Sequence, residues 1–448
     1  MTAQTANSLP RTKPRARAGV LVFLVLLIAA IAVRTLFWHY RSGDFVDYYE
    51  RWYAFVRSHG GFGALEHPFA NYNMPYLYLL AAVSYLPVPS LVAVKLIPTV
   101  FDALLGFFVY RLVGLRRPSG PAAPIAAGIV LVLPSIVLNS SMWGQADSTY
   151  VALGVGGLYY LVRREHWPAC ALLGAALAFK LQVVFLFPVL LPLLLLRWLP
   201  WRALIAIPAV YLLLDVPALL LGANPRDLLL VYYNQTQLDD RFSVTTPNVY
   251  QFLDPPGSPA VQHIGLAVAV AVVLGLTALL VVNRVRPDAT VVLLLALVSV
   301  LVIPFLLPKM HERYFYLADV ISVVAAFWLP RRLWPVPVLV QFASALSYLP
   351  FLLLPYRLRE LTGDSALADG SGLLGSGFAE GRSMFRALLG LGGNPLGRLH
   401  EIFAPVVDFR VLAAAVLVAT VWALVVTARL LRTAPEPFAT VAGEGTPP

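Results

Sequence analysis

The amino-acid sequence predicts an all-α protein, a polytopic transmembrane helical bundle. Of its 448 residues, 59% are hydrophobic and only 12% are charged, whereas a soluble protein carries roughly a quarter of charged residues. Apolar runs of about 20 residues, each long enough to cross the hydrocarbon core, recur from end to end. A transmembrane β-barrel would show shorter segments of alternating polarity instead.

The net charge of +10 is better explained by membrane topology than by a nucleic-acid partner. Basic residues cluster in short connections, as the positive-inside rule expects of cytoplasmic loops. The sequence has no basic helix with interleaved aromatic residues, so nucleic-acid binding is not expected. The single cysteine, Cys170, lies in an apolar run, which excludes an internal disulfide and a thiolate metal site.

The first apolar run extends from about Gly19 to Phe37 and follows four basic residues. It is too long for a signal peptide and lacks a small-residue cleavage site, so we interpret it as an uncleaved first span. Residues 1–18 would then form a cytoplasmic N-terminal segment.

The short segment Pro75–Leu86 decides the rest of the topology. All later arginine pairs can be cytoplasmic together only if this segment does not cross the membrane. It has about a dozen residues and is bounded by prolines, so it suits a re-entrant or juxtamembrane helix. The sequence then predicts about 12 spans, near 19–38, 92–112, 121–139, 147–163, 167–180, 183–198, 202–221, 262–283, 288–307, 314–330, 334–355 and 406–431.

These spans define one transmembrane domain over 19–431, with both termini inside. Longer outside loops are predicted near 41–74, 222–261 and 356–405. The tail 432–448, rich in Thr, Pro, Glu and Gly, is predicted to be cytoplasmic and disordered. The sequence shows no soluble domain of useful size and no internal repeat.

Polar motifs at the ends of these spans carry the functional signal, because ionisable groups at a membrane boundary are costly to keep. The first motif contains Asp44 and Asp47, which lie three residues apart among aromatic residues and would share one helix face. Either aspartate could act as a general base held at the membrane surface. The alternative is an interfacial aromatic belt with ordinary solvated acids.

The second group of motifs offers contacts for a sugar. Tyr72 lies in the run Asn71–Leu79, whose polar groups could hydrogen-bond a glycan or simply suit an interface. Trp143 and Gln145 add a flat stacking surface and an amide next to Asp147. The alternative for Asp147 is a first-turn acid that favours a helix N-terminus.

Lys180 and Gln182 interrupt an otherwise apolar stretch. Such a lysine either extends to the interface or binds an anion. Asp102 lies within a predicted span. It could pair there with a buried polar group or act in a proton relay.

The most compact motif follows Pro308, where a predicted span ends outside. Two cations there oppose the positive-inside bias, and a bound phosphate is the simplest reason for them, with arginine as a bidentate donor. The motif has no second histidine at metal-ligand spacing, so no zinc site is expected. Its candidate residues are Lys309, His311, Glu312, Arg313 and Tyr314.

Together these motifs resemble the GT-C superfamily of integral-membrane glycosyltransferases, which use polyprenyl-phosphate-linked sugars. The likeness is greatest to bacterial relatives of the mannosyltransferase that adds the second mannose of GPI anchors. It is carried by Gly43-Asp44, Asn71–Leu79, Trp143–Asp147, the Ala-Phe-Lys-Leu-Gln run ending at Gln182, and His311–Tyr314. These motifs extend over most of the chain.

The resemblance implies an inverting transfer of a hexose, with mannose as the candidate. Asp44 would be the catalytic base, with Asp47 as its rival. Cations at Lys180, Lys309 and Arg313 would stabilise the departing lipid phosphate. Asp147 would position a sugar. No cofactor or metal is implied, although a metal held by Asp44 and Asp147 stays an alternative.

The implied partners are a polyprenyl-phosphate-linked donor, a lipid or glycan acceptor of the cell envelope, and the bilayer itself. The implied location is a bacterial plasma membrane, with the active site on the extracytoplasmic face. A transporter or flippase of lipid-linked saccharide is the main alternative, and a glycan polymerase or ligase is the second. Transporters usually place binding groups near the midplane, whereas these motifs lie at span ends.

Overall fold

The computed structural model describes residues 13–237, 243–244, 246–253, 259–352 and 408–432. Most of the predicted cytoplasmic segment 1–18, the outside loop 356–405 and nearly all of the tail 432–448 lie outside the described residues. Expectations about these parts therefore stay predictions.

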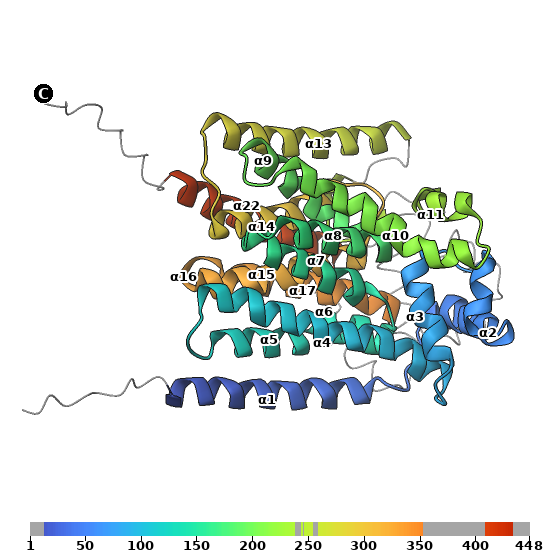
Figure 1. Cartoon of the computed structure of the whole chain (residues 1–448). Helices are drawn as coiled ribbons and strands as arrows, with labels where there is room; N and C mark the ends of the chain where they lie inside the picture. Colours follow the sequence, from blue (N-terminus) through green and yellow to red (C-terminus); the bar gives the residue numbers. More distant parts are fainter. Residues whose placement is uncertain (1–12, 238–242, 245, 254–258, 353–407, 433–448) are drawn as a thin grey trace, which may run out of the picture.

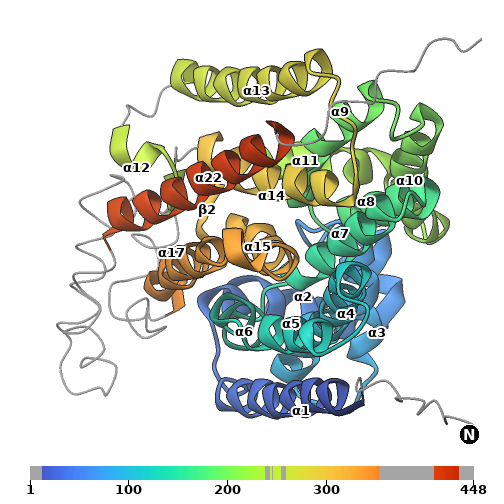
Figure 2. The same cartoon turned by 90° about the vertical axis from the view of Figure 1, so that its left-hand side faces the viewer.

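Most helices run side by side and form a bundle (Figure 1), and α1 and α13 lie along opposite edges of it (Figure 2). The bundle helices are α1 (Lys13–Leu36), α4 (Ser90–Arg116), α5 (Ala122–Val132), α6 (Pro134–Val137), α7 (Asp147–Val162), α8 (His166–Phe179), α9 (Leu190–Leu195), α10 (Ala206–Leu220), α13 (Pro259–Val282), α14 (Ala289–Leu306), α15 (Tyr316–Trp328), α16 (Pro330–Leu333), α17 (Pro335–Leu352) and α22 (Phe409–Arg432).

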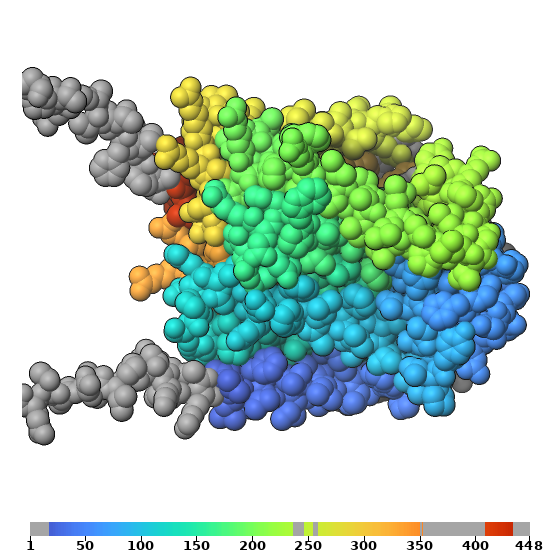
Figure 3. Space-filling model, viewed as in Figure 1, coloured from blue at the N-terminus to red at the C-terminus, as the bar shows by residue number. Residues whose placement is uncertain are grey.

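A group of shorter elements lies beyond the ends of these helices, where residues around 45–85 and 225–237 gather at one end of the molecule (Figure 3). Other short elements interrupt or join the bundle helices. These elements are η1 (Phe45–Tyr49), α2 (Glu50–Ser58), η2 (Gly61–Glu66), α3 (Met74–Ser84), η3 (Leu138–Trp143), η4 (Leu181–Val189), η5 (Trp201–Ile205), α11 (Pro225–Gln237), β1 (Ser243–Val244), α12 (Tyr250–Leu253), β2 (Met310–His311) and η6 (Glu312–Phe315).

The helices support a multi-pass membrane protein but do not confirm the predicted count of 12 spans. Six helices in the described part of the chain are long and apolar enough to cross a membrane, or seven if the pair Ala122–Val132 and Pro134–Trp143, bent by 50°, counts as one span. Other predicted spans fold as shorter helices, because prolines and polar residues interrupt them. The predicted spans 167–180 and 183–198, for example, become α8, η4 and α9, with an extended backbone at Lys180 and Pro188 inside η4.

The segment Pro75–Leu86 forms the 11-residue helix α3. Asn73 caps it by accepting a hydrogen bond from the Met74 N–H, and Pro75 occupies its first turn, as suits a helix start. It packs against α2 and η2 at the end of the bundle. A helix of this length is too short to span the hydrocarbon core, which agrees with a non-crossing segment.

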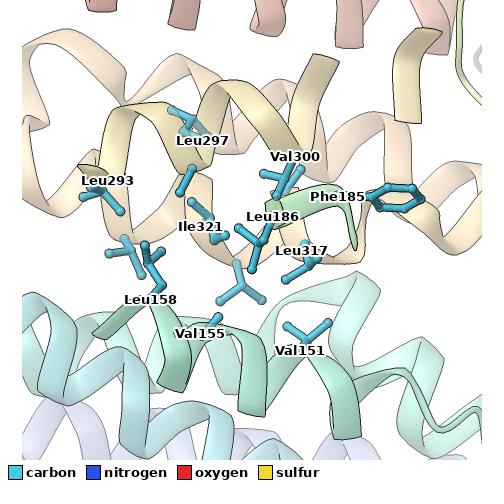
Figure 4. Close-up of a cluster of buried hydrophobic side chains, with 14 of the residues drawn as sticks. Val151, Val155, Leu158, Phe185, Leu186, Leu293, Leu297, Val300, Leu317 and Ile321 are labelled. Atoms are coloured by element: carbon cyan, nitrogen blue, oxygen red, sulfur yellow. The ribbon is translucent and has the colours of Figure 1, made fainter. Parts of the chain in front are cut away.

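The centre of the bundle is apolar and buried. Side chains of α7, including Val155 and Leu158, meet Leu297 of α14 and Ile321 of α15 there (Figure 4). By contrast, α1 and α13 expose long apolar faces. The buried centre fixes how α7 and α15 lie, and the N-terminal ends of both helices reach a cluster of polar side chains.

Candidate active site

The loop that carries Asp44 is tied to the turn before α7. The Ser42 hydroxyl accepts a hydrogen bond from the Phe45 N–H at 3.1 Å and donates one to the Trp143 carbonyl at 2.5 Å. Asp44 directly precedes η1 and Trp143 ends η3, and both of these elements are π-helical turns. Such turns are frequent at functional sites. Residues about 100 positions apart in the sequence are thereby brought together.

One carboxylate oxygen of Asp44 is fixed by two donors. The Trp143 indole N–H donates to Asp44 Oδ2 at 3.0 Å, and the Gln145 side-chain amide donates to the same oxygen. Gly144 between these donors has φ of +78°, a left-handed conformation that suits glycine. The described residues give Asp44 Oδ1 no hydrogen bond, so this oxygen of the half-buried carboxylate is available.

Gln145 connects Asp44 to a group of tyrosines. Its Oε1 atom accepts hydrogen bonds from the Tyr49 hydroxyl at 3.1 Å and from the Tyr72 hydroxyl at 3.2 Å. The Lys180 ammonium lies 5.2 Å from the centre of the Tyr72 ring. Asp47 is half-buried in η1, but the indole and amide donors both contact Asp44, the other candidate base.

Two cations converge on the buried carboxylate of Asp147, which is 1% exposed. Lys180 donates to Asp147 Oδ1 at 2.6 Å, and Arg313 Nε lies 3.7 Å from Oδ2. The Asn139 side-chain amide also donates to Oδ2, at 2.7 Å. The Arg313 guanidinium carbon lies 5.4 Å from the centre of the Trp143 ring. The base candidate and both cations therefore belong to one connected cluster.

Glu312 is a second buried carboxylate beside Arg313. Arg313 Nη1 donates to Glu312 Oε1 at 2.9 Å, while Glu312 Oε2 is buried without a hydrogen-bond partner among the described residues. Burial raises the pKa of Glu312 to about 7, although the neighbouring Arg313 charge acts in the opposite direction. This carboxyl group can thus change charge near neutral pH.

The rest of the Lys309–Tyr314 motif lies around this cluster. Lys309 is half-buried with φ of 58°, and β2, which contains His311, pairs in parallel with β1. The His311 and Tyr314 rings are 5.2 Å apart. Gln182 lies in η4 with its Oε1 atom buried and without a partner in the described part of the chain.

Sequence reasoning missed several residues that hold this cluster, above all Lys95. Its ammonium group, buried in α4, donates to the backbone carbonyls of Phe37, Trp38 and Tyr40 at 2.8, 3.3 and 2.6 Å. Its stem also packs beneath Gly144. Lys95 thus supports both the chain leading to Asp44 and the turn that holds it. The sequence feature that could have identified Lys95 is a lysine inside an apolar predicted span.

Among the described residues, no group of three His, Cys, Asp or Glu side chains could hold a metal ion. A metal between Asp44 and Asp147 would have to compete with Lys180 and Asn139, which already contact both oxygens of Asp147. The donor set therefore does not favour that alternative.

No protein-family model matches the sequence, and no curated protein matches it. A solved structure does match in fold: ArnT from Cupriavidus metallidurans, crystallised bound to undecaprenyl phosphate. The two chains are 16% identical, and the match covers 93% of this chain and 79% of ArnT with a TM-score of 0.51. At this identity the likeness concerns the fold. The chain has the fold of ArnT over nearly its whole length.

Proposed function

We propose that this protein is a membrane glycosyltransferase that moves a hexose from a polyprenyl-phosphate donor to an extracytoplasmic lipid or glycan acceptor. The observation that carries the proposal is the cluster itself: a carboxylate with one fixed and one available oxygen lies in the same network as a buried lysine and arginine. A base and an anion-binding group are the two parts that such a transfer requires.

The shared fold supports this class of reaction. ArnT was crystallised with undecaprenyl phosphate, which is the lipid that remains once a sugar leaves an undecaprenyl-phosphate carrier. The fold and the polar motifs together support the resemblance to the GT-C superfamily.

Asp44 is the base in this proposal. The hydrogen bonds from Trp143 and Gln145 to Oδ2 orient the carboxylate and leave Oδ1 to accept a proton. An acceptor hydroxyl would give its proton to Oδ1 while its oxygen attacks the anomeric carbon from the face opposite the phosphate. The bond from that carbon to the phosphate oxygen breaks, and the electron pair leaves with the lipid phosphate. The configuration at the sugar inverts.

Lys180 and Arg313 would stabilise the departing phosphate, whose negative charge increases in the transition state. Arg313 is the better candidate for direct contact. Its Nε atom has no hydrogen-bond partner among the described residues, and its side chain is 17% exposed, against 8% for Lys180. Lys309 and His311 are further candidates at the edge of the cluster.

Trp143 and Asp147, which the sequence suggested as sugar contacts, are buried, and we assign both of them supporting roles. Trp143 is 3% exposed, and its ring packs between Arg313 and Tyr348, so we assign it to orienting Asp44. Asp147 holds Lys180 and Arg313. The half-buried Tyr72, which lies 5.2 Å from Trp52 ring to ring, is a better surface for stacking a sugar.

The decisive experiment is a membrane assay with polyprenyl-phospho-hexose donors, beginning with mannose. Asp44→Asn should lower transfer by about 10²- to 10⁴-fold, the usual contribution of a general base. Asp47→Asn is the matched control, since it removes the same charge from the same loop, and it should retain transfer. Undiminished activity in Asp44→Asn together with its loss in Asp47→Asn would reverse the assignment.

The same assay separates the enzyme from a flippase. A flippase would yield no transferred hexose with any donor, yet would move lipid-linked saccharide across proteoliposome membranes. A reporter fused after Pro87 would test the non-crossing assignment of α3, because a crossing there changes the predicted side of every later loop.

A further inference from the structure

A basic pocket lies at the end of the bundle opposite the candidate active site. Helix α7 begins at Asp147 in that site and ends at Val162, so its two ends are about 24 Å apart at 1.5 Å per residue. Beyond the second end, a pocket of about 540 Å³ is lined by Arg164, His166, Arg197, Trp198 and Trp201, among others. None of these residues belongs to the proposed reaction.

Both arginines of the pocket occupy a backbone position that favours glycine. Arg164 follows α7 with φ of 64°, and Arg197 follows α9 with φ of 57°. Each helix closes with a Schellman pair of hydrogen bonds, for example from the Trp198 N–H to the Leu193 carbonyl at 2.8 Å and from the Arg197 N–H to the Leu194 carbonyl at 3.1 Å. Glycine is the usual residue there. The sequence keeps an arginine at this position in both turns.

The two guanidinium groups have no carboxylate partner in the described part of the chain. Arg164 stacks at 3.9 Å over the Trp198 ring, and stacking through the flat face leaves the N–H edge free for hydrogen bonds. The neighbouring Arg163 differs, since it pairs with Glu165 at 2.6 Å. Trp198 is 8% exposed, and its indole N–H is buried without a partner among the described residues, as is His166 Nε2.

The surroundings are those of a membrane interface. Trp167 and Trp201 are 56% and 62% exposed, and Leu195 is 53% exposed. Exposed tryptophans of this kind typically lie at the level of lipid headgroups. The pocket therefore offers two arginines for a phosphate beside apolar surface for acyl chains.

We propose that this pocket binds the headgroup phosphate of an anionic membrane phospholipid. The arginines would contact the phosphate oxygens by charge-assisted hydrogen bonds, while Trp201 and Leu194, which line the pocket, would contact the glycerol and the first carbons of the chains. Basic pockets between membrane helices are known to bind such headgroups. The apolar rim favours a lipid over free phosphate.

The test uses the full chain in detergent, with phosphatidylglycerol as the probe and phosphatidylcholine as the zwitterionic reference. Bound lipid is measured by native mass spectrometry, and the rise in the unfolding temperature is measured in parallel. Wild type should bind phosphatidylglycerol more tightly than phosphatidylcholine. Arg164→Asn and Arg197→Asn should each weaken that binding roughly fivefold. Asparagine tolerates the left-handed conformation, so the charge is removed with little backbone cost.

Arg284→Asn is the matched control, because Arg284 also ends a helix in the left-handed conformation, with φ of 49°, but does not line the pocket. It should bind phosphatidylglycerol like wild type. Equal binding of both lipids, equal losses in all three variants, or full competition by soluble glycerol phosphate would each overturn the lipid site.

Discussion

Two buried ion pairs in this bundle use the same chemistry and differ in whether their hydrogen bonds are complete. Arg34 of α1 pairs with Asp102 of α4 at 2.8 Å. The guanidinium also donates to the Leu131 carbonyl at 2.7 Å, and the second oxygen of Asp102 accepts from the Ser148 hydroxyl. This pair is closed, since neither residue has a fully buried polar side-chain atom without a hydrogen-bond partner.

The pair of Arg313 and Glu312, beside Lys180 and Asp147, is open. Arg313 Nε lies 3.7 Å from Asp147 Oδ2 but has no hydrogen-bond partner among the described residues, and neither has Glu312 Oε2. A buried polar group without a partner is unfavourable. A substrate that supplies the missing partners would offset that cost. Whether every buried polar atom has a hydrogen-bond partner thus distinguishes an ion pair that joins helices from one that can bind a ligand.

Breaking the closed pair should have the largest effect, and that effect should be on folding. Arg34→Met leaves Asp102 buried without its cation, which costs about 3–5 kcal/mol of unfolding free energy. The double variant Arg34→Met/Asp102→Leu should recover most of this loss, because it buries no unpaired charge. Thermal unfolding in detergent measures both. A double variant as unstable as the single one would contradict a purely structural pair.

Replacing the arginine of the open pair by lysine should affect turnover more than folding. Arg313→Lys keeps the positive charge but loses the planar fork that contacts Glu312 and faces Asp147. Transfer should fall by about 10²- to 10³-fold, as when a transition-state donor is removed. Arg41→Lys is the control, because Arg41 pairs with Glu50 at the same end but is 52% exposed. Such surface pairs contribute about 0–1 kcal/mol, so its activity should stay near that of wild type.

The contrast also shows how far the sequence could predict the fold. Runs of about 20 apolar residues predicted α1, α4, α13, α14 and α22 within a few residues of their ends. The count of spans was not confirmed, because hydropathy averages over interruptions. The bend between Val132 and Pro134 divides the stretch predicted as the single span 121–139. The extended backbone at Lys180, by contrast, lies at the break predicted between 167–180 and 183–198.

For the site, the sequence predicted the polar motifs but not the hydrogen bonds that connect them. Asp44, Asp147 and Arg313 stand out as charges at span ends, and the structure brings them into one cluster. Ser42 and Asn139 are ordinary in sequence, because their importance comes from hydrogen bonds across about 100 and 8 positions, respectively. Spacing alone also does not predict the π-helical turn at Phe45–Tyr49, which directly follows Asp44 and contains Asp47.

The smallest predicted effect is a change in pH dependence at the open pair. Burial raises the pKa of Glu312 to about 7. Below that pH the neutral carboxyl leaves Arg313 free for the phosphodiester of the donor, and above it the carboxylate competes for Arg313. The wild-type KM for the donor should therefore rise as the pH passes 7, while Glu312→Gln should show no such rise.

The same carboxyl group should make stability depend on pH. The folded protein binds more protons at Glu312 than the unfolded chain does between the ordinary pKa of 4.5 and about 7. Wild-type stability should therefore fall as the pH rises through that window, and the stability of Glu312→Gln should lack this component. Glu50→Gln, at an exposed pair, is the control. Identical stability profiles for wild type and Glu312→Gln would mean that the pKa of Glu312 is not raised in the folded protein.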